Sequence, residues 1–109
     1  MQTLRRRMND GIHFVYIMTN ASNNVLYVGM TSDLAQRVQS HKDRLVSGFT
    51  QKYSCTKCVY FESTPDRDAA LYREKQIKGW TRVKKAYLVN GFNPDWKDLF
   101  DMIITRQSS

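Results

Sequence analysis

The stretch FVYIMTNASNNVLYVGMTSDLAQRVQSHK, residues 14–42, decides the fold of this chain. Its first half places β-branched and aromatic residues on both sides of the turn-forming sequence NASNN. This pattern predicts two strands, over His13–Thr19 and Val25–Gly29, that pair as a β-hairpin. Tyr16 and Tyr27 fall on the two strands, and we expect them to lie opposite or diagonal to one another.

A helix is predicted directly after the hairpin. The sequence TSD (Thr31–Asp33) supplies candidates for its N-cap. We expect the helix to continue to about Leu45 or Val46, because Gly48 then stands just beyond its end.

One face of this helix is an apolar stripe that contains a histidine. Leu34, Val38 and Leu45 form the stripe, and His41 falls in its middle. Arg37 precedes His41 by one helical turn, so the two side chains share a face. A lone histidine in such a stripe is usually a core residue, but arginine binds phosphate with two hydrogen bonds and histidine can move a proton. The pattern therefore also suits a site for phosphodiesters.

The rest of the chain predicts one more strand and further helices. KCVYFES (57–63) is a strand. A helix follows with a threonine cap, Pro65 as its first residue and a break at Gly79. TRVKKAYLV (81–89) predicts another helix, and NPDWKDLF (93–100) a short helical turn. The order predicts an α+β domain with a small, mostly antiparallel sheet flanked by helices.

We expect three regions along the chain. Residues 1–11 predict a flexible basic arm, 12–100 the folded domain, and 101–109 a C-terminal tail. Aromatic residues at helical spacing are expected to pack in the core rather than to stack on bases; they are Trp80, Tyr87 and Trp96.

Composition bounds the class of protein. The 109 residues suit one domain, and 17 Lys and Arg against 10 Asp and Glu give a net charge of +7. This charge suits a polyanion such as nucleic acid, although a soluble protein with a basic surface has the same balance. We find no secretory segment and no apolar run of the roughly 20 residues that span a membrane. Cys55 and Cys58 lack a second cysteine pair for zinc, so we expect free thiols in a cytoplasmic protein.

Glu74 stands on the apolar face of the helix that follows Pro65. A carboxylate in that place costs free energy unless it is paired. Two interpretations remain open: a salt bridge with Lys78 or Arg37, or a ligand for a hard cation such as Mg²⁺. The residues expected to make the buried face around it are Ala70, Leu71 and Ile77.

These features occur in the order seen in a known family. They are Tyr16 within FVYIM, YVG (27–29), TSDLAQRVQSHK (31–42), the helical Glu74 and the late motif NPDWKDL (93–99). Over Ile12 to Leu99 the chain resembles the GIY-YIG nuclease superfamily, and most closely its small single-domain branch. The resemblance implies a three-stranded antiparallel sheet with helices on it. It also implies hydrolysis of phosphodiester bonds in nucleic acid with one divalent metal, Mg²⁺ or Mn²⁺.

The resemblance also implies the site. Tyr16 and Tyr27 match the two signature tyrosines, Arg37 matches the arginine that steadies the phosphate, and His41 matches a position held by histidine or tyrosine. Glu74 matches the single metal-binding glutamate. The candidate catalytic residues are thus Tyr16, Tyr27, Arg37, His41 and Glu74, with Glu74 as the metal ligand. Tyr16, Tyr27 and His41 all remain candidates for the general base.

Two departures from the family pattern weaken this expectation. The first motif reads Phe14-Val15-Tyr16 without a leading glycine, and Met30 follows YVG where some relatives carry a lysine. We therefore keep three functions open: an endonuclease with DNA as its first substrate, a weak or inactive nucleic-acid-binding module on the same fold, and a protein-interaction adaptor. We expect no membrane partner, and leave RNA as substrate, a protein partner and a homodimer open.

Overall fold

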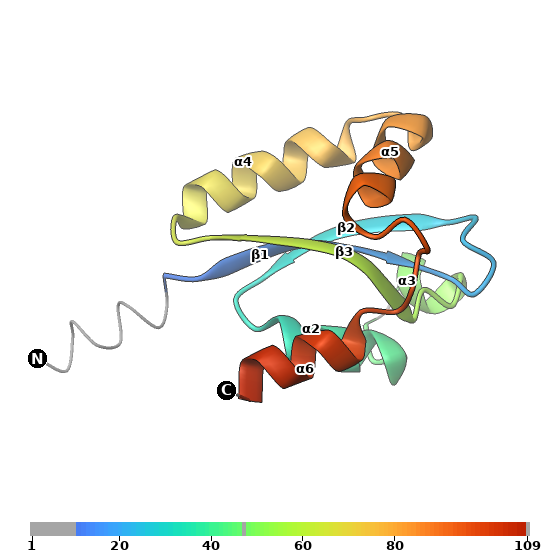
Figure 1. The fold of residues 1–109 in the computed structure, drawn as a ribbon, viewed down its shortest axis with the longest axis horizontal. Coiled ribbons are helices and arrows are strands. Elements are labelled where there is room, and N and C mark those ends of the chain that lie inside the picture. Colours follow the sequence, from blue (N-terminus) through green and yellow to red (C-terminus); the bar gives the residue numbers. More distant parts are fainter. Residues whose placement is uncertain (1–10, 47, 109) are drawn as a thin grey trace, which may run out of the picture.

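The computed structural model describes residues 11–46 and 48–108 (Figure 1). The basic arm expected over 1–11 lies outside the described residues, apart from Gly11.

The centre of the fold is a three-stranded antiparallel sheet. Its strands are β1 (His13–Thr19), β2 (Leu26–Thr31) and β3 (Lys57–Thr64), in the spatial order β2-β1-β3. The predicted hairpin is confirmed: β1 pairs with β2 in a register that places Tyr16 opposite Gly29. Tyr27 lies opposite Met18, and is therefore diagonal to Tyr16 on the same face of the sheet.

Five helices are described, and the sheet separates most of them into two layers (Figure 1). Helices α4 and α5 cover one face, and α2 and α6 cover the other. The predicted α+β class with a small antiparallel sheet is confirmed. The helix bounds are α2 (Leu34–Lys42), α3 (Phe49–Lys52), α4 (Arg67–Lys78), α5 (Arg82–Phe92) and α6 (Phe100–Ser108).

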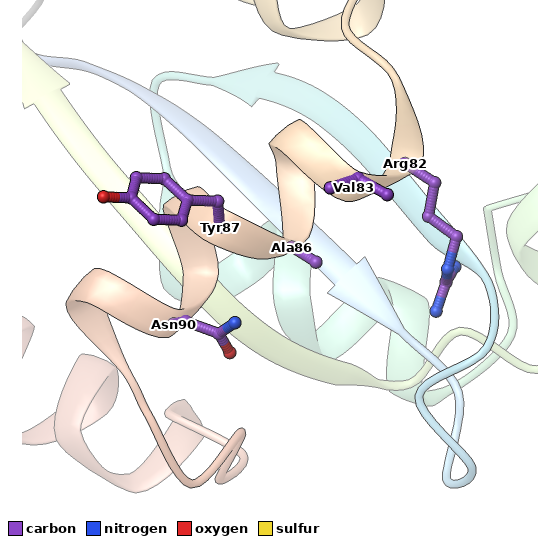
Figure 2. A pocket seen from close by; sticks show the side chains of 5 residues that line it. All are labelled: Arg82, Val83, Ala86, Tyr87 and Asn90. Carbon is purple, nitrogen blue, oxygen red and sulfur yellow. The ribbon is translucent and has the colours of Figure 1, made fainter.

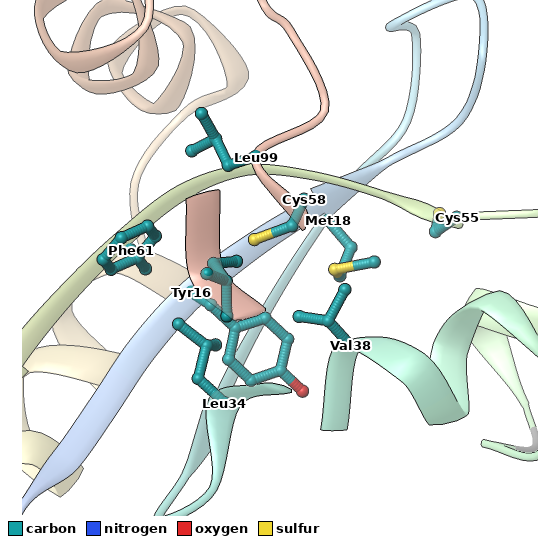
Figure 3. Close-up of a cluster of buried hydrophobic side chains, with 9 residues drawn as sticks. Tyr16, Met18, Leu34, Val38, Cys55, Cys58, Phe61 and Leu99 are labelled. Atoms are coloured by element: carbon teal, nitrogen blue, oxygen red, sulfur yellow. The ribbon is translucent and has the colours of Figure 1, made fainter. Parts of the chain in front are cut away.

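Strand side chains alternate between the two layers, so the sheet has two apolar clusters. Toward α4 and α5, Val15 and Ile17 of β1 pack among buried residues that include Ala70 and Ile77. Toward α2, Tyr16 packs among Met18, Leu34, Val38, Cys55, Cys58, Phe61, Leu99 and Ile103 (Figure 3). The Tyr16 ring is thus part of a hydrophobic core, and its hydroxyl points toward α2.

Helix α2 is shorter than predicted. Asp33 caps its first turn, since the Asp33 side chain accepts a hydrogen bond from the Gln36 N–H. The helix ends at the C-cap Asp43, and Arg44 has a φ of 59°, a left-handed conformation that no α-helix continues. Leu45 is consequently 74% exposed, and the expectation that it extends the apolar stripe is wrong.

The start of α4 also differs from the prediction. Asp66 is the N-cap, and its side chain accepts a hydrogen bond from the Asp68 N–H. The threonine and proline before it therefore precede the helix, and Pro65 is not its first residue. Thr64 instead accepts a hydrogen bond from the Asp66 N–H. Aspartate is preferred over threonine at the N-cap position, which explains why the helix starts after Asp66 and not after Thr64.

Helix α5 differs from the prediction in its C-terminal end and in the burial of Tyr87. The helix continues to Phe92. Tyr87 is 79% exposed, so the expectation that it packs in the core is wrong. Trp80 and Trp96 are partly buried against the cluster beneath α4 and α5, as expected.

The C-terminal segment forms a helix where a tail was expected. Helix α6 begins at Phe100, and Ile103 within it is 2% exposed in the cluster around Tyr16. The preceding NPDWKDL motif attaches it to β3. The Asn93 amide donates hydrogen bonds to the Val59 carbonyl at 3.1 Å and to the Lys97 carbonyl at 2.8 Å, and the Leu99 N–H donates to the Cys58 carbonyl at 2.8 Å.

Across the described part of the chain, each helix is too short or too polar to cross a bilayer.

Candidate active site

The Tyr16 ring packs against Gly29 of β2, in a space that a side chain at position 29 would fill. A Cβ atom built on Gly29 would stand 2.5 Å from both Cζ and the hydroxyl oxygen of Tyr16. Such contacts are far inside van der Waals distance, so any larger residue at position 29 displaces the ring. The glycine of the YVG motif therefore allows Tyr16 to reach across the neighbouring strand toward α2.

Three rings meet at this place. The Tyr16 hydroxyl and His41 Nε2 share a buried hydrogen bond of 3.0 Å. The ring centroids of Tyr27 and His41 are 5.5 Å apart, and those of Tyr16 and Tyr27 are 6.4 Å apart. The two strand tyrosines and the helical histidine thus form one cluster.

Arg37 precedes His41 by one turn of α2 and is half-buried. Its Nε atom is buried and has no hydrogen-bond partner, and the same holds for His41 Nδ1. Buried polar atoms without a partner are rare, because each leaves a desolvated group uncompensated. Two of them lie on successive turns of one helix.

Burial changes the proton affinities of this cluster. Burial, and then the positive charge of Arg37, lower the pKa of His41 to about 4, so its imidazole is neutral at neutral pH. Burial, together with the neighbouring Tyr27, raises the pKa of Tyr16 well above its usual value despite the opposing charge of Arg37. Tyr16 is therefore a phenol and not a phenolate in the free protein.

Glu74 lies on α4, on the other side of the sheet from α2 (Figure 1). Its side chain is only 17% exposed, and its carboxylate accepts a salt bridge of 3.1 Å from Lys78 Nζ. Of the two pairings considered from sequence, the structure has the one with Lys78. The Glu74 charge still reaches Tyr16, since it is among the smaller effects that raise the Tyr16 pKa. The fold thus brings the two tyrosines, Arg37 and His41 together, whereas Glu74 lies on α4, across the sheet from α2.

Glu74 is the carboxylate among the five candidate residues that could contact a divalent cation. No group of three or more His, Cys, Asp or Glu side chains gathers at one point in the described residues. A single carboxylate with room for water and phosphate oxygens is the typical protein contribution to a Mg²⁺ site. The Lys78 side chain is 51% exposed, so its ammonium can move into solvent when a cation takes its place.

The two departures from the family pattern lie in different places, since Phe14 packs against the hydrophobic cluster that contains Tyr16 and Met30 lies on the other face of the sheet. Met30 pairs with Val15 and packs against the cluster beneath α4 and α5. Its side chain belongs to the opposite face of β2 from Gly29.

A surface hollow of about 280 Å³ also lies on α5, lined by Arg82, Val83, Ala86, Tyr87 and Asn90 (Figure 2). It contains none of the five candidate catalytic residues.

The fold and the paired tyrosines define a class of protein. Residues 12–87 match the GIY-YIG catalytic domain, and the chain belongs to this family. Within it, the chain is 41% identical over 81 residues to a UPF0213 protein of Haloquadratum walsbyi, a match that covers 74% of this chain and 89% of that protein. A UPF0213 protein of Staphylococcus aureus is 36% identical over 77 residues, which cover 71% of this chain and 93% of that protein.

A solved structure shows the same fold. The solution NMR structure of the UPF0213 protein BH0048 from Bacillus halodurans superposes with a TM-score of 0.52 and 24% sequence identity. The match covers 80% of this chain and 92% of that chain.

Sequence reasoning assigned no role to three residues near the site. Gly29 belongs to the YVG motif, but its contact with Tyr16 depends on the strand register, which a motif does not reveal. Phe49 contacts the Tyr27 ring, and Tyr53 contacts the Phe49 ring. Their four-residue spacing after Gly48 was the available signal.

Proposed function

We propose that this protein is a divalent-metal-dependent endonuclease that hydrolyses phosphodiester bonds of nucleic acid, with DNA as its first substrate. Its membership of the GIY-YIG family supports a nuclease-type activity acting on nucleic acid. The net charge of +7 supports a polyanionic substrate. The five candidate residues, Tyr16, Tyr27, Arg37, His41 and Glu74, supply the side chains.

The observation that carries this proposal is the pair of buried nitrogen atoms without partners, Arg37 Nε and His41 Nδ1. If the Tyr16 hydroxyl donates to His41 Nε2, the neutral imidazole carries its proton on Nδ1. Both unpartnered atoms are then donors on one helix face, and a phosphate oxygen is the acceptor that would satisfy them. Arg37 stabilises the charge that grows on the phosphate oxygens as the bond breaks.

The proton of the attacking water needs an acceptor. Tyr16 is not a base by itself, because burial raises its pKa. It can instead pass its hydroxyl proton to His41 Nε2 while it takes a proton from water, so that hydroxide, neutral Tyr16 and a protonated imidazole result. This relay makes His41 the final acceptor, and it requires the negative charge of a bound phosphate to raise the pKa of the imidazole above its value of about 4 in the free protein. Tyr27 lies against both rings.

Glu74 is the residue that would hold the metal. A bound divalent cation supplies charge stabilisation to the phosphate and to the leaving oxygen. In the free protein the Glu74 carboxylate forms a salt bridge with Lys78. We assign no other metal ligand.

The test uses the purified full chain with labelled single-stranded, duplex and branched DNA in the presence of Mg²⁺ or Mn²⁺. We expect cleavage by the unaltered protein and a loss of about 100-fold or more for Glu74→Gln and for Arg37→Gln. Lys75→Gln is the matched control, since it alters an exposed side chain beside Glu74 on the same helix. Cleavage that persists at full rate in both site variants would overturn the proposal.

The same experiment separates the proposal from the binding module that the sequence left open. Salt-sensitive binding of the DNA without cutting in any metal, indifferent to Glu74→Gln, is the result that favours a silent nuclease fold. One observation favours that alternative. Met30, which replaces the lysine of some relatives, packs against an apolar cluster.

A further inference from the structure

The aromatic rings of Tyr27, Phe49 and Tyr53 form a row from the candidate site to the protein surface. The ring of Phe49 on α3 stacks beside Tyr27, with centroids 6.2 Å apart and planes inclined by 26°. The ring of Tyr53, which caps the end of α3, lies 4.8 Å from that of Phe49. Because Tyr27 contacts His41, the rings connect the proposed proton acceptor to the protein surface.

The outer two rings are open to solvent. Phe49 is 45% exposed and Tyr53 is 41% exposed. Gly48, with a φ of 86°, turns the chain so that Phe49 begins α3 next to the hairpin. Two adjacent exposed rings form an apolar surface, and their position beside the candidate site is where a ligand with a flat ring could cover them.

The charges around these rings favour an anionic occupant. Lys52 Nζ lies 5.4 Å from the centre of the Tyr53 ring. Arg44 is exposed in the turn before α3, where the Gln51 side chain donates a hydrogen bond of 2.8 Å to its carbonyl. α3 itself carries no acidic residue. A ligand with a flat apolar ring and a phosphate matches both features.

We propose that Phe49 and Tyr53 form a stacking platform for an unpaired nucleobase of the substrate strand, next to the phosphate bound at Arg37. This inference rests on the proposed function and adds a substrate class to it. In a continuous duplex each base face is covered by its neighbours, whereas single strands, flaps and branch points offer free faces. The protein therefore selects nucleic acid that has unpaired nucleotides beside the cleaved bond.

The test measures stacking without cutting. The reference is the Glu74→Gln protein, mixed with a short single-stranded DNA that contains 2-aminopurine, a base whose fluorescence falls when it stacks on an aromatic ring. We expect quenching on binding, and about a tenfold weaker Kd with most of the quenching lost in Phe49→Leu/Tyr53→Leu. Tyr53→Leu alone should give a smaller loss, and Tyr53→Trp should retain the quenching.

Tyr87→Leu is the matched control, since it removes an aromatic ring that is 79% exposed on α5 and should leave the quenching unchanged. Thermal unfolding checks that each variant is folded. Absence of quenching in the reference protein, or quenching that the double variant keeps, overturns the inference.

The two proposals fail in different ways. If the unaltered protein cuts no substrate while quenching still depends on Phe49 and Tyr53, the platform stands and the nuclease does not. If it cuts single-stranded and duplex DNA equally and the double variant changes neither rate, the nuclease stands and the platform is overturned.

Discussion

Tyr16 and Gly29 are the two residues whose contact most constrains the site. The phenol fills the space that glycine leaves on the facing strand, and there its hydroxyl meets His41. The tyrosine was predictable as a site residue from its place in the motif. The role of the glycine was not, because it depends on which strand residue faces which.

Replacement of this glycine should therefore be costly. Gly29→Ala places a methyl group where Tyr16 stands, and we expect it to destabilise the protein by about 1–3 kcal/mol and to break the bond to His41. Urea unfolding measures the difference. In Gly91→Ala, the new Cβ meets nothing within 4 Å, so this helical control should stabilise by about 0.4–1 kcal/mol. Equal effects of the two substitutions would show that the contact is not a constraint.

His41 should make stability depend on pH. Its pKa is about 4 in the folded protein and near the model-peptide value of 6.5 when unfolded, so the unfolded chain binds more protons between these values. Stability is then full above 6.5 and falls as the pH drops toward 4, by on the order of 2–3 kcal/mol. Urea unfolding across this window should show a smaller fall for His41→Gln. Identical pH profiles of the two proteins would contradict the buried neutral imidazole.

Lys78 should compete with a cation for Glu74. Removal of its ammonium in Lys78→Gln frees the carboxylate from its salt bridge, and we expect the apparent affinity for Mn²⁺ to rise about two- to fivefold. Calorimetric titration of Mn²⁺ gives the value. Lys75→Gln removes one positive charge from the residue after Glu74 on α4 without breaking that bridge. A gain as large in this control would mean that only the net charge matters.

At the scale of elements, the strands followed the sequence closely and the helix ends did not. The first predicted strand has the observed bounds, because its β-branched and aromatic residues have no competing signal. Helix α2 ends before Arg44 because that residue has a left-handed conformation. An arginine in the sequence does not predict this conformation. Tyr87 was misplaced because helical spacing shows that a residue is on a helix but not whether another layer covers it.

Helix α6 is the element that sequence reasoning missed, and it contributes to the core that holds Tyr16. Ile103 is 2% exposed in that cluster. We expect Ile103→Ala to destabilise the protein by about 2–4 kcal/mol, because it removes buried methyl groups and leaves a cavity. The neighbouring Ile104 is 38% exposed, and Ile104→Ala should cost less than about 1 kcal/mol. Chemical unfolding of both variants tests this, and similar costs would place α6 outside the core.

At the scale of the whole molecule, helices cover both faces of the sheet, so the candidate residues are divided between two layers. One face buries the inner parts of Tyr16 and α2, and the other carries α4 with Glu74. The sequence predicted the fold class, which follows from patterns along the chain, and its motifs supplied the candidate site residues, which stay a prediction. It did not predict the aromatic rings of α3 as neighbours of Tyr27, because that contact joins segments whose relation only the folded chain defines.

The central claim is that Glu74 holds a divalent cation within reach of the tyrosine, arginine and histidine cluster. Anomalous diffraction from crystals soaked in Mn²⁺ tests it most directly. We predict one strong peak at about 2.1 Å from a Glu74 carboxylate oxygen, with Lys78 turned away from it. The absence of a peak at Glu74, with Mn²⁺ bound at some other group of side chains, would contradict the account.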